Sequence, residues 1–406
     1  MNPPFPPHSP EHARREPAPM SPPRSVPDST SDPRHPGRIT AGELVLVCSH
    51  YNLGTIRTVR KLPGGSRESP KVLLISDHAS YLLKRRAPGA ASDPHTVALT
   101  HEIILFLESR GVPAPQLVGT RKDNNSLLQL SPEALAKAPA PAADEPATEP
   151  VRGPRVYEVY KFVRGRPYAR TTGDASGAGD LLAHVHAELR EFRPSWRLPR
   201  GSYHARPDAA RLLRSIARHQ PEHAPICRSL EERYARAWER AAANGADLLS
   251  EQIIHADWHP GNLIYAIESA QQPLSKVAAI LDFDSARQAP ALMDAVNGAM
   301  QFALGKKTVA GQMQLALGPD LFQAFWAGFN RARRERPPQI DDGLDQARPS
   351  IPWLMIEALV LEAATPIAAT GAFERMEAGA ILRAVDKAAG ALENAQTELV
   401  RLSSIQ

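Results

Sequence analysis

Two short segments in the second half of the chain carry the residues best suited to chemistry. The first runs from His255 to Asn262 and reads HADWHPGN, and the second reads Asp282-Phe283-Asp284. A carboxylate can accept the proton of a substrate hydroxyl, while an amide oxygen and a second carboxylate can hold Mg²⁺ against phosphates. Phosphoryl transfer requires these groups, because it depends on positioning and on neutralising developing charge. The spacing of Asp257, Asn262 and Asp282 therefore predicts phosphoryl transfer.

Each segment follows a short apolar run that predicts a β-strand. Ile253 and Ile254 precede the first segment, and the run from Val277 to Leu281 precedes the second. An apolar strand that ends in an acid delivers that acid, rigidly held, to the edge of a cleft. We therefore expect a β interruption from Ile253 to Phe283 in an otherwise helical region.

These motifs also resemble a known family. HADWHPGNLI followed by ILDFDSA looks like the aminoglycoside phosphotransferase and choline kinase family, relatives of the protein kinases that phosphorylate small molecules. The resemblance implies that Asp257 is the catalytic base and that Asn262 and Asp282 ligate magnesium. His255 would brace the catalytic loop by hydrogen bonds, and Gly261 would let the loop turn tightly before Asn262.

Three positions near the motifs depart from the family or extend it. Asp284 stands where protein kinases have glycine, and it would either touch a second magnesium ion or accept a hydrogen bond beside the metal. Ala256 replaces the usual glycine after the motif histidine, a change that is tolerable if its φ is negative. Asp294 lies where the family has an acid that caps a helix and braces the catalytic loop, so we expect a structural role.

A glycine pair in the first half fits the same resemblance. Gly64 and Gly65, followed by Ser66, resemble the loop that covers the nucleotide phosphates in homoserine kinase-like members. Glycines there permit close backbone approach and point N–H groups at phosphate oxygens. The same pair is also common in ordinary hairpin turns.

A lysine at the end of a predicted strand is the expected phosphate-binding cation. Lys84 follows Tyr81-Leu82-Leu83, although Arg85 and Arg86 leave the register open. Glu102, on the helix predicted from Pro94 to Arg110, is the expected partner that holds Lys84 in place. Glu108 is the competing candidate, and both glutamates also suit a solvated helix face.

The segment from Val156 to Gly165 resembles the hinge of the family. Its backbone would hydrogen-bond the adenine, with apolar side chains above and below the ring, and we assign Val159, Tyr160 and Phe162 to this site. A buried strand is the simpler explanation of the same apolar pattern, and both interpretations can hold together.

Two other functions are compatible with parts of the sequence. His255, Asp257 and His259 have spacing that suits Zn²⁺ or a two-metal hydrolase site, but that interpretation leaves Asn262 and Asp282 without a role. A degraded kinase fold that only binds nucleotide is the other alternative, although such proteins usually lack the base or a metal ligand. A protein kinase is disfavoured, because no Ala-Pro-Glu motif follows Asp282.

The acceptor pocket is expected among the late helices. Glu357 and Glu362 lie inside the apolar helical run from Trp353, and a carboxylate there needs a partner or a cleft because unpaired burial is costly. We expect this helix to form a wall of the pocket. Further candidate acids, which are also typical of a solvated loop, are Asp341, Asp342 and Asp345. An aromatic set at helical spacing is expected in the core: Phe322, Phe325, Trp326 and Phe329.

Proline defines the organisation of the chain. It makes up 39 of 406 residues, about twice the usual share of ~5%, and it clusters in residues 1–38 and 131–154. We interpret 1–38 as a disordered tail and 131–154 as an Ala/Pro-rich loop insert. Residues 39–160 are expected to form a nucleotide-binding N-lobe, and residues 161–406 a helical C-lobe with the catalytic and metal motifs.

These elements predict an α+β, bilobal protein-kinase-like fold with a small antiparallel sheet, one helix and a larger helical lobe. The predicted strands are 53–59, 71–76, 80–84, 126–130 and 155–160, with a strand or helical turn at 42–47. The predicted helices after 94–110 are 179–192, 209–219, 228–243, 319–334, 351–369 and 373–402.

Composition narrows the function further. The net charge is only +4, which is weak evidence for binding nucleic acid. Cys48 and Cys227 are too few for a disulfide framework, no apolar run approaches the ~18 residues that a membrane span needs, and the N-terminus has no signal-peptide pattern. We expect a cytoplasmic, ATP- and Mg²⁺-dependent enzyme without membrane or nucleic-acid partners. Its acceptor would be a small-molecule hydroxyl in an amino alcohol, hydroxy amino acid, sugar or aminoglycoside-like compound.

Overall fold

The computed structural model describes residues 39–62, 69–89, 92–139, 153–204, 208–269, 274–309, 312–336, 342–373 and 376–405. Several predictions from the sequence concern residues outside these ranges. They are the Pro-rich tail 1–38, the loop residues Gly64, Gly65 and Ser66, most of the insert 131–154, and Asp341.

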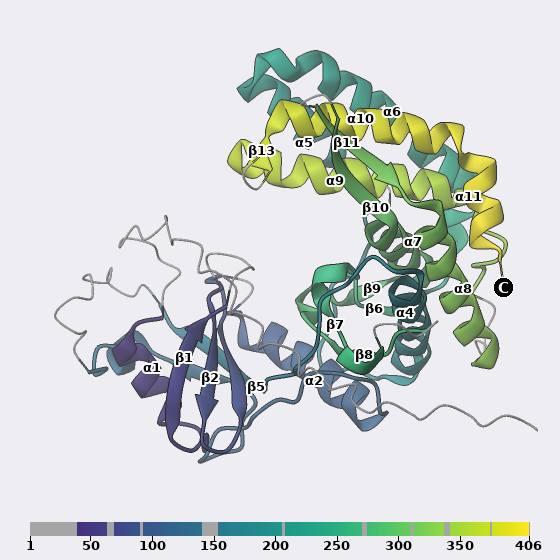
Figure 1. Ribbon diagram of the computed structural model, residues 1–406. Coiled ribbons are helices and arrows are strands. Elements are labelled where there is room, and N and C mark those ends of the chain that lie inside the picture. Colours follow the sequence, from purple (N-terminus) through teal and green to yellow (C-terminus); the bar gives the residue numbers. More distant parts are fainter. Residues whose placement is uncertain are drawn as a thin grey trace, which may run out of the picture.

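The first part of the described chain forms an antiparallel five-stranded sheet in the order β1-β2-β3-β5-β4 (Figure 1). Its strands are β1 Ile56–Lys61, β2 Lys71–Ser76, β3 Ser80–Arg85, β4 Leu128–Leu130 and β5 Arg155–Lys161. The segment at 42–47, left open between strand and helix, belongs to helix α1 Ala41–Cys48. Helix α3 Pro132–Leu135 begins the insert. We call this part, residues 39–161, the sheet lobe.

Helix α2 Pro94–Ser109 lies between the sheet and the rest of the molecule in Figure 1. The Asp93 side chain accepts a hydrogen bond from the backbone N–H of Thr96, and Pro94 occupies the first turn, where its missing N–H costs nothing. Gly111 ends the helix with a φ of +76°, a conformation that glycine adopts without strain.

The second part is mainly helical, and we call residues 162–405 the helical lobe (Figure 1). Its helices are α4 Thr172–Glu191, α5 Asp208–His219, α6 Ala224–Ala243, α7 Ala291–Ala303, α8 Pro319–Glu335, α9 Ile351–Thr370, α10 Ala378–Asn394 and α11 Gln396–Ser403. Helices α4 and α8 cross at glycines: a Cβ on Gly179 would lie 2.0 Å from the carbonyl oxygen of Phe325. The aromatic set of α8 is buried in the core, as expected.

Two hairpin-like strand pairs carry the motifs. Strand β6 Glu251–Ile254 pairs with β9 Arg287–Pro290, and β7 Leu263–Tyr265 pairs with β8 Val277–Ile280. The predicted β interruption is therefore confirmed. Two further hairpins were not predicted: β10 Leu304–Val309 with β11 Gln312–Leu317, and β12 Ala372–Phe373 with β13 Met376–Glu377. The last pair and a break at Ala395 make the single helix predicted over 373–402 too long.

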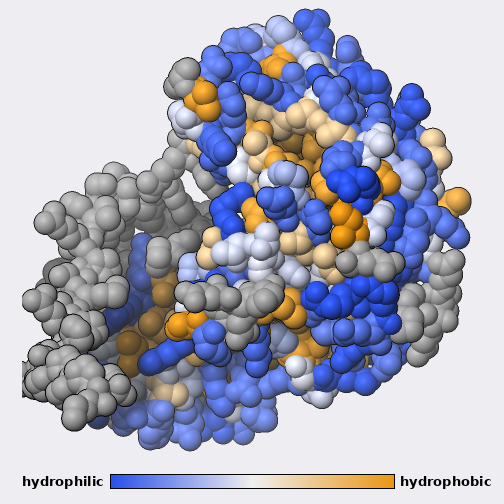
Figure 2. Space-filling model, turned by 45° about the vertical axis from the view of Figure 1, so that its right-hand side comes forward, coloured by the Kyte–Doolittle hydropathy of each residue, from blue (hydrophilic) through white to orange (hydrophobic). Residues whose placement is uncertain are grey.

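Each lobe has its own hydrophobic core. The core of the sheet lobe includes Leu74, Leu83, Tyr157 and Val159, while the larger core joins α2 to the helices that follow. The surface is largely hydrophilic, and Figure 2 shows apolar residues gathered in a hollow of the helical lobe. Burial raises the pKa of both thiols, Cys48 and Cys227, to about 11, which fits unreactive cysteines.

One helix corrects the prediction on apolar length. The segment Arg348–Thr370, which contains α9, is long and apolar enough to cross a membrane by length and composition. However, 72% of its most apolar window is buried inside the protein. A core helix passes the same test, so the segment is weak evidence for a membrane span.

Candidate active site

The loop after β6 is built around His255, which is fully buried. Its Nε2–H donates to the carbonyl of Leu281 at 3.0 Å, and its Nδ1 accepts the backbone N–H of Asp257 at 3.2 Å. Burial lowers the pKa of His255, which favours a neutral ring with its proton on Nε2. The ring therefore ties the catalytic loop to the end of β8, the bracing that the sequence suggested.

Asp294 holds the same loop from the first turn of α7. Its carboxylate accepts the backbone N–H of His255 at 2.9 Å and that of Ala256 at 3.0 Å. The Nε2 of His186 lies 3.2 Å from it. Asp294 is therefore a brace, as expected, but it does not cap the helix, because the residue at the cap is Pro290.

The backbone at Ala256 departs from the expected negative φ. Its φ is +62°, in the left-handed region that glycine adopts freely, and a non-glycine residue pays about 1–2 kcal/mol there. The hydrogen bond from its N–H to Asp294 helps to hold this conformation. Asp282, at the other motif, also has a positive φ, of +60°. Backbone strain is thus concentrated at both motif residues.

Asp257 lies at the entrance of a pocket, with 43% of its side chain exposed. Its Oδ2 accepts from the amide Nδ2 of Asn262 at 2.9 Å, and its Oδ1 lies 3.6 Å from the Nε2 of His259. Burial alone would raise the pKa of Asp257, but the nearby rings of His259 and His255 outweigh it, so the pKa lies below its usual value. Asp257 is therefore an ionised carboxylate that can accept a proton.

The second motif faces the cations of the sheet lobe. The Nζ of Lys84 lies 3.2 Å from Asp282 Oδ1 and 2.8 Å from Asp284 Oδ2. Lys71 lies 3.6 Å from the other oxygen of Asp282. Burial would raise the pKa of Asp282, but Lys84 and Lys71 lower it to about 2. The structure thus brings Lys84 together with both aspartates, as a shared phosphate and metal site requires.

The oxygen donors of this site fit magnesium, which prefers carboxylate and amide oxygens. The Nδ2 of Asn262 donates to the backbone carbonyl and the carboxylate of Asp257, so its amide oxygen faces away from Asp257. The backbone N–H of Leu281 donates to the Asn262 carbonyl at 2.7 Å and so fixes Asn262 beside the end of β8. Asp284 fits less well, because Arg86 binds its second oxygen at 2.7 Å.

Glu102 is not the partner of Lys84. Its Oε2 accepts the backbone N–H of Ser195 at 3.0 Å, which directs it away from the sheet. The competitor Glu108 accepts from Gln116 instead. The predicted pairing is therefore wrong, and the acid directly opposite Lys84 in the sheet is the buried Glu158 on β5. Its signal in the sequence was a charge in the middle of the apolar run from Val156 to Tyr160.

Several polar groups of the hinge segment already form hydrogen bonds within the protein. The carbonyl of Val159 accepts from Val118 N at 2.8 Å, and Phe162 N donates to Ser80 O at 2.9 Å. Tyr160 donates its hydroxyl to Glu158 at 3.0 Å. The N–H of Phe162 is thus already bonded to Ser80, while the Val159 carbonyl keeps a second lone pair, and adenine binding by this segment stays a prediction.

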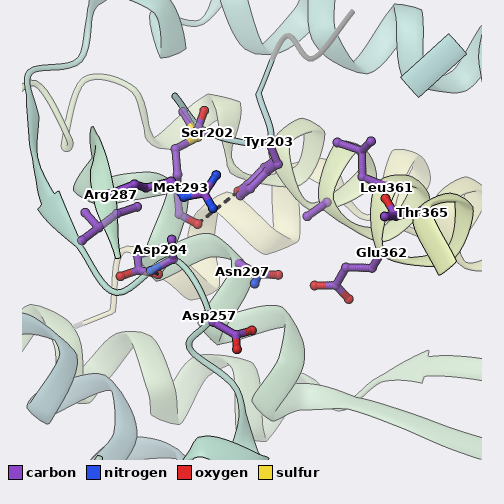
Figure 3. Close-up of a pocket in the computed structure, with 13 residues that line it drawn as sticks. Ser202, Tyr203, Asp257, Arg287, Met293, Asp294, Asn297, Leu361, Glu362 and Thr365 are labelled. Atoms are coloured by element: carbon purple, nitrogen blue, oxygen red, sulfur yellow. Dashed lines mark hydrogen bonds between the residues drawn. The ribbon is translucent and has the colours of Figure 1, made fainter. Parts of the chain in front are cut away.

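A cavity of about 240 Å³ opens beside Asp257 (Figure 3). Helix α9 forms one wall, as predicted, and contributes Leu361, Glu362 and Thr365. Figure 3 shows the Glu362 carboxylate extending toward the side on which Asp257 and Asn297 lie. Burial raises the pKa of Glu362 to about 7, and its Oε2 accepts from the amide of Gln301.

The other candidate acids are occupied elsewhere. Asp342 binds Arg190 and Arg333, and Asp345 binds Arg348, so these acids have structural ion pairs. Glu357 is fully buried and lies 2.8 Å from the Nδ1 of His204. The metallohydrolase alternative also lacks support, since the described ranges hold no group of three or more His, Cys, Asp or Glu placed to bind a metal ion.

Known structures identify the fold. The microcompartment-associated aminopropanol kinase has a TM-score of 0.59 and 17% identity, covering 88% of this chain and 99% of its own. Amicoumacin kinase hAmiN has a TM-score of 0.56 and 12% identity, covering 89% of this chain and 95% of its own. Choline kinase from Cryptosporidium parvum Iowa II has a TM-score of 0.52 and 12% identity, covering 88% of this chain and 96% of its own. The predicted α+β, kinase-like bilobal fold is therefore confirmed.

The family follows from the sequence itself. The family model described as "Phosphotransferase enzyme family" matches residues 58–336, which span both lobes and both acidic motifs. The chain belongs to this phosphotransferase family. No curated protein matches the sequence.

Proposed function

We propose that the protein is an ATP-dependent kinase that phosphorylates a hydroxyl group of a small molecule. The observation that carries this proposal is that two polar pairs meet at the end of β8: Asn262 binds Asp257, which lines the cavity, and also accepts the N–H of Leu281, the residue before Asp282, which binds Lys84. Amicoumacin kinase hAmiN, which is similar in fold, was solved in complex with AMP-PNP and Ca²⁺, a nucleotide and a divalent cation of the kind proposed here.

In this mechanism, Asp257 accepts the proton of the acceptor hydroxyl as the hydroxyl oxygen attacks the γ-phosphorus. A new O–P bond forms, the bond from the γ-phosphorus to the bridging oxygen breaks, and ADP leaves with that oxygen. Asn262 and Asp282 would hold magnesium, which supplies neutralisation of the charge that develops on the phosphates. Lys84 adds a further positive charge, and the buried His255 keeps the Asp257 loop in place.

The acceptor is proposed to carry a positive charge. The cavity has apolar walls, such as Leu361, and its lining includes three acids, of which Asp294 is bound to the catalytic loop and Asp257 and Glu362 are the candidates for substrate contact. A protonated amine would neutralise Glu362 while its neighbouring hydroxyl reaches Asp257. Amino alcohols, amino sugars and hydroxy amino acids combine both groups, and Arg287 is a cation in the same cavity lining.

The test is ADP release from Mg²⁺-ATP over pooled acceptors: amino alcohols, hydroxy amino acids, hexosamines, choline and aminoglycosides. Asp257→Asn is the blank, since it keeps the shape of the side chain and removes the base. We expect release above this blank from one pool of amine-bearing acceptors. Nucleotide binding without release from any pool would favour the alternative of a degraded, nucleotide-binding kinase fold. Equal release by both proteins would refute the role of Asp257.

A further inference from the structure

Lys84 of β3, Arg86 directly after this strand, and one acid of β5 share a face of the sheet. Lys84 and Glu158 are directly opposite in the β3–β5 ladder, and Arg86 follows Lys84 by two residues. Side chains two apart on a strand lie on the same face, and opposite residues of neighbouring strands are in contact range. Arg85 points to the other face, where it binds Glu43 at 2.9 Å.

Glu158 is the centre of a buried polar cluster. It is 0% exposed, and its Oε1 accepts from Arg86 at 2.9 Å and from the Tyr160 hydroxyl at 3.0 Å. The Nε2 of His101, on α2, lies 2.6 Å from the same oxygen. Burial would raise the pKa of Glu158, but His101 and Arg86 lower it, so the acid is ionised. Helix α2 is thus attached to the sheet through His101 and not through a carboxylate.

Arg86 continues this cluster to the metal motif. Its guanidinium binds Asp284 Oδ1 at 2.7 Å, while Lys84 binds Asp284 Oδ2 at 2.8 Å. The same Asp284 lies two residues after Asp282, the expected magnesium ligand. A continuous series of charged contacts therefore runs from α2 through β5 and β3 to the catalytic face of the helical lobe.

One acceptor of this cluster has no partner. Within the described residues, Glu158 Oε2 is buried without a hydrogen bond. An unsatisfied buried acceptor costs about 1–3 kcal/mol, so a polar group that reaches it would be favoured. Lys84 lies directly opposite Glu158 in the ladder. It is the cation that would pair with Glu158 Oε2 when a bound nucleotide and magnesium engage Asp282 and Asp284.

We propose that Glu158 and Arg86 are positioning residues that hold Lys84 and Asp284 for the nucleotide, the task that kinase-like sequences assign to a carboxylate of the helix. This inference rests on the proposed kinase function. It predicts that, of the two glutamates Glu158 and Glu102, only the loss of Glu158 weakens Mg²⁺-nucleotide binding.

The experiment measures the dissociation constant of Mg²⁺-AMP-PNP by titration calorimetry for the wild type, Glu158→Gln and Glu102→Gln, with melting temperatures of the free proteins. Glu→Gln keeps shape in both variants and removes one charge. We expect about a tenfold weaker affinity for Glu158→Gln, as for groups that orient metal ligands, and less than a twofold change for Glu102→Gln. The opposite ranking would overturn the proposal.

A double-mutant cycle separates positioning from general destabilisation. Arg86→Met and Asp284→Asn are combined, and the affinity for Mg²⁺-AMP-PNP is compared with that of each single variant. If Arg86 acts through Asp284, its replacement costs much less affinity when Asp284 is already changed, whereas additive losses would overturn this. The single variant Arg86→Met serves if Glu158→Gln does not fold, because it removes the contacts to both carboxylates. A wild type that fails to bind Mg²⁺-AMP-PNP would refute the proposed function itself, which separates the two failures.

Discussion

Replacing Glu362 by glutamine is expected to make the protein more stable and its acceptor site worse. Glu362 lies on α9 at the wall of the cavity, and its Oε2 accepts from Gln301. Within the described chain, none of the ion pairs involves Glu362, so burial of its negative charge is offset only in part, by the amides of Gln301 and Asn297 and by the more distant ring of His259. Glutamine keeps the shape and an acceptor oxygen but never ionises.

The magnitude follows from the pKa of Glu362. Burial raises this pKa from 4.5 to about 7, and each pKa unit corresponds to 1.36 kcal/mol. Because the pKa is raised on folding, the unfolded chain loses the Glu362 proton at a lower pH than the folded protein does. The contribution of Glu362 to the free energy of unfolding is therefore unpenalised below pH 4.5, and the penalty grows as the pH rises from 4.5 through 7. The penalty at pH 8 is then about 3 kcal/mol at most, and the Glu362→Gln variant should recover about 2 kcal/mol of it.

Urea unfolding of both proteins between pH 4.5 and 8 measures this difference. Glu335→Gln, at an exposed position of α8, is the matched control and should run parallel to the wild type. The Glu362→Gln curve should lie at or slightly below the wild type at pH 4.5 and above it at pH 8. A difference that stays constant over this range would refute the reasoning. In kinetic assays, the same variant should raise KM for a cationic acceptor and leave KM for ATP unchanged.

Three further predictions concern the loop and the metal site. Ala256→Gly should stabilise the protein by about 0.5–1 kcal/mol in urea unfolding, because it relieves the strain at φ +62° by more than the entropy that glycine adds to the unfolded chain; a loss of stability would contradict the observed backbone. Asp294→Ala should cost about 3–5 kcal/mol, since it leaves the buried N–H of His255 and that of Ala256 without their acceptor; a loss under about 1 kcal/mol would show that the loop rearranges. Asp282→Ala should weaken Mg²⁺-nucleotide binding about tenfold or more in calorimetry, and an unchanged affinity would remove Asp282 from the metal site.

The catalytic loop could be predicted because its geometry is local. Asp257 and Asn262 are five residues apart at the end of one strand, so their contact of 2.9 Å depends on a short, tightly turned segment. The strand that carries Asp282 was indicated by the apolar run from Val277 to Leu281, whereas its pairing with β7, which brings Asp282 to the catalytic loop, was not predicted. The wall formed by α9 could be predicted for a similar reason, since a carboxylate in an apolar helix must face a partner or a cavity.

The anchor of Lys84 could not be assigned in the same way, because it depends on how a helix is rotated against a sheet. His101 and Glu102 are adjacent on α2 and point about 100° apart, so a small rotation decides which of them meets β5. The apolar positions of α2 leave this angle open, and a search for a carboxylate selected Glu102. Glu158 was the residue in the sequence that could have indicated the answer, because a charged side chain in the centre of a buried strand needs cationic partners on its own face of the sheet. Arg86, two residues after Lys84, meets that requirement. The basic residues at the end of β3 therefore indicate that Lys84 is held through Arg86 and Glu158 and not through a carboxylate of α2.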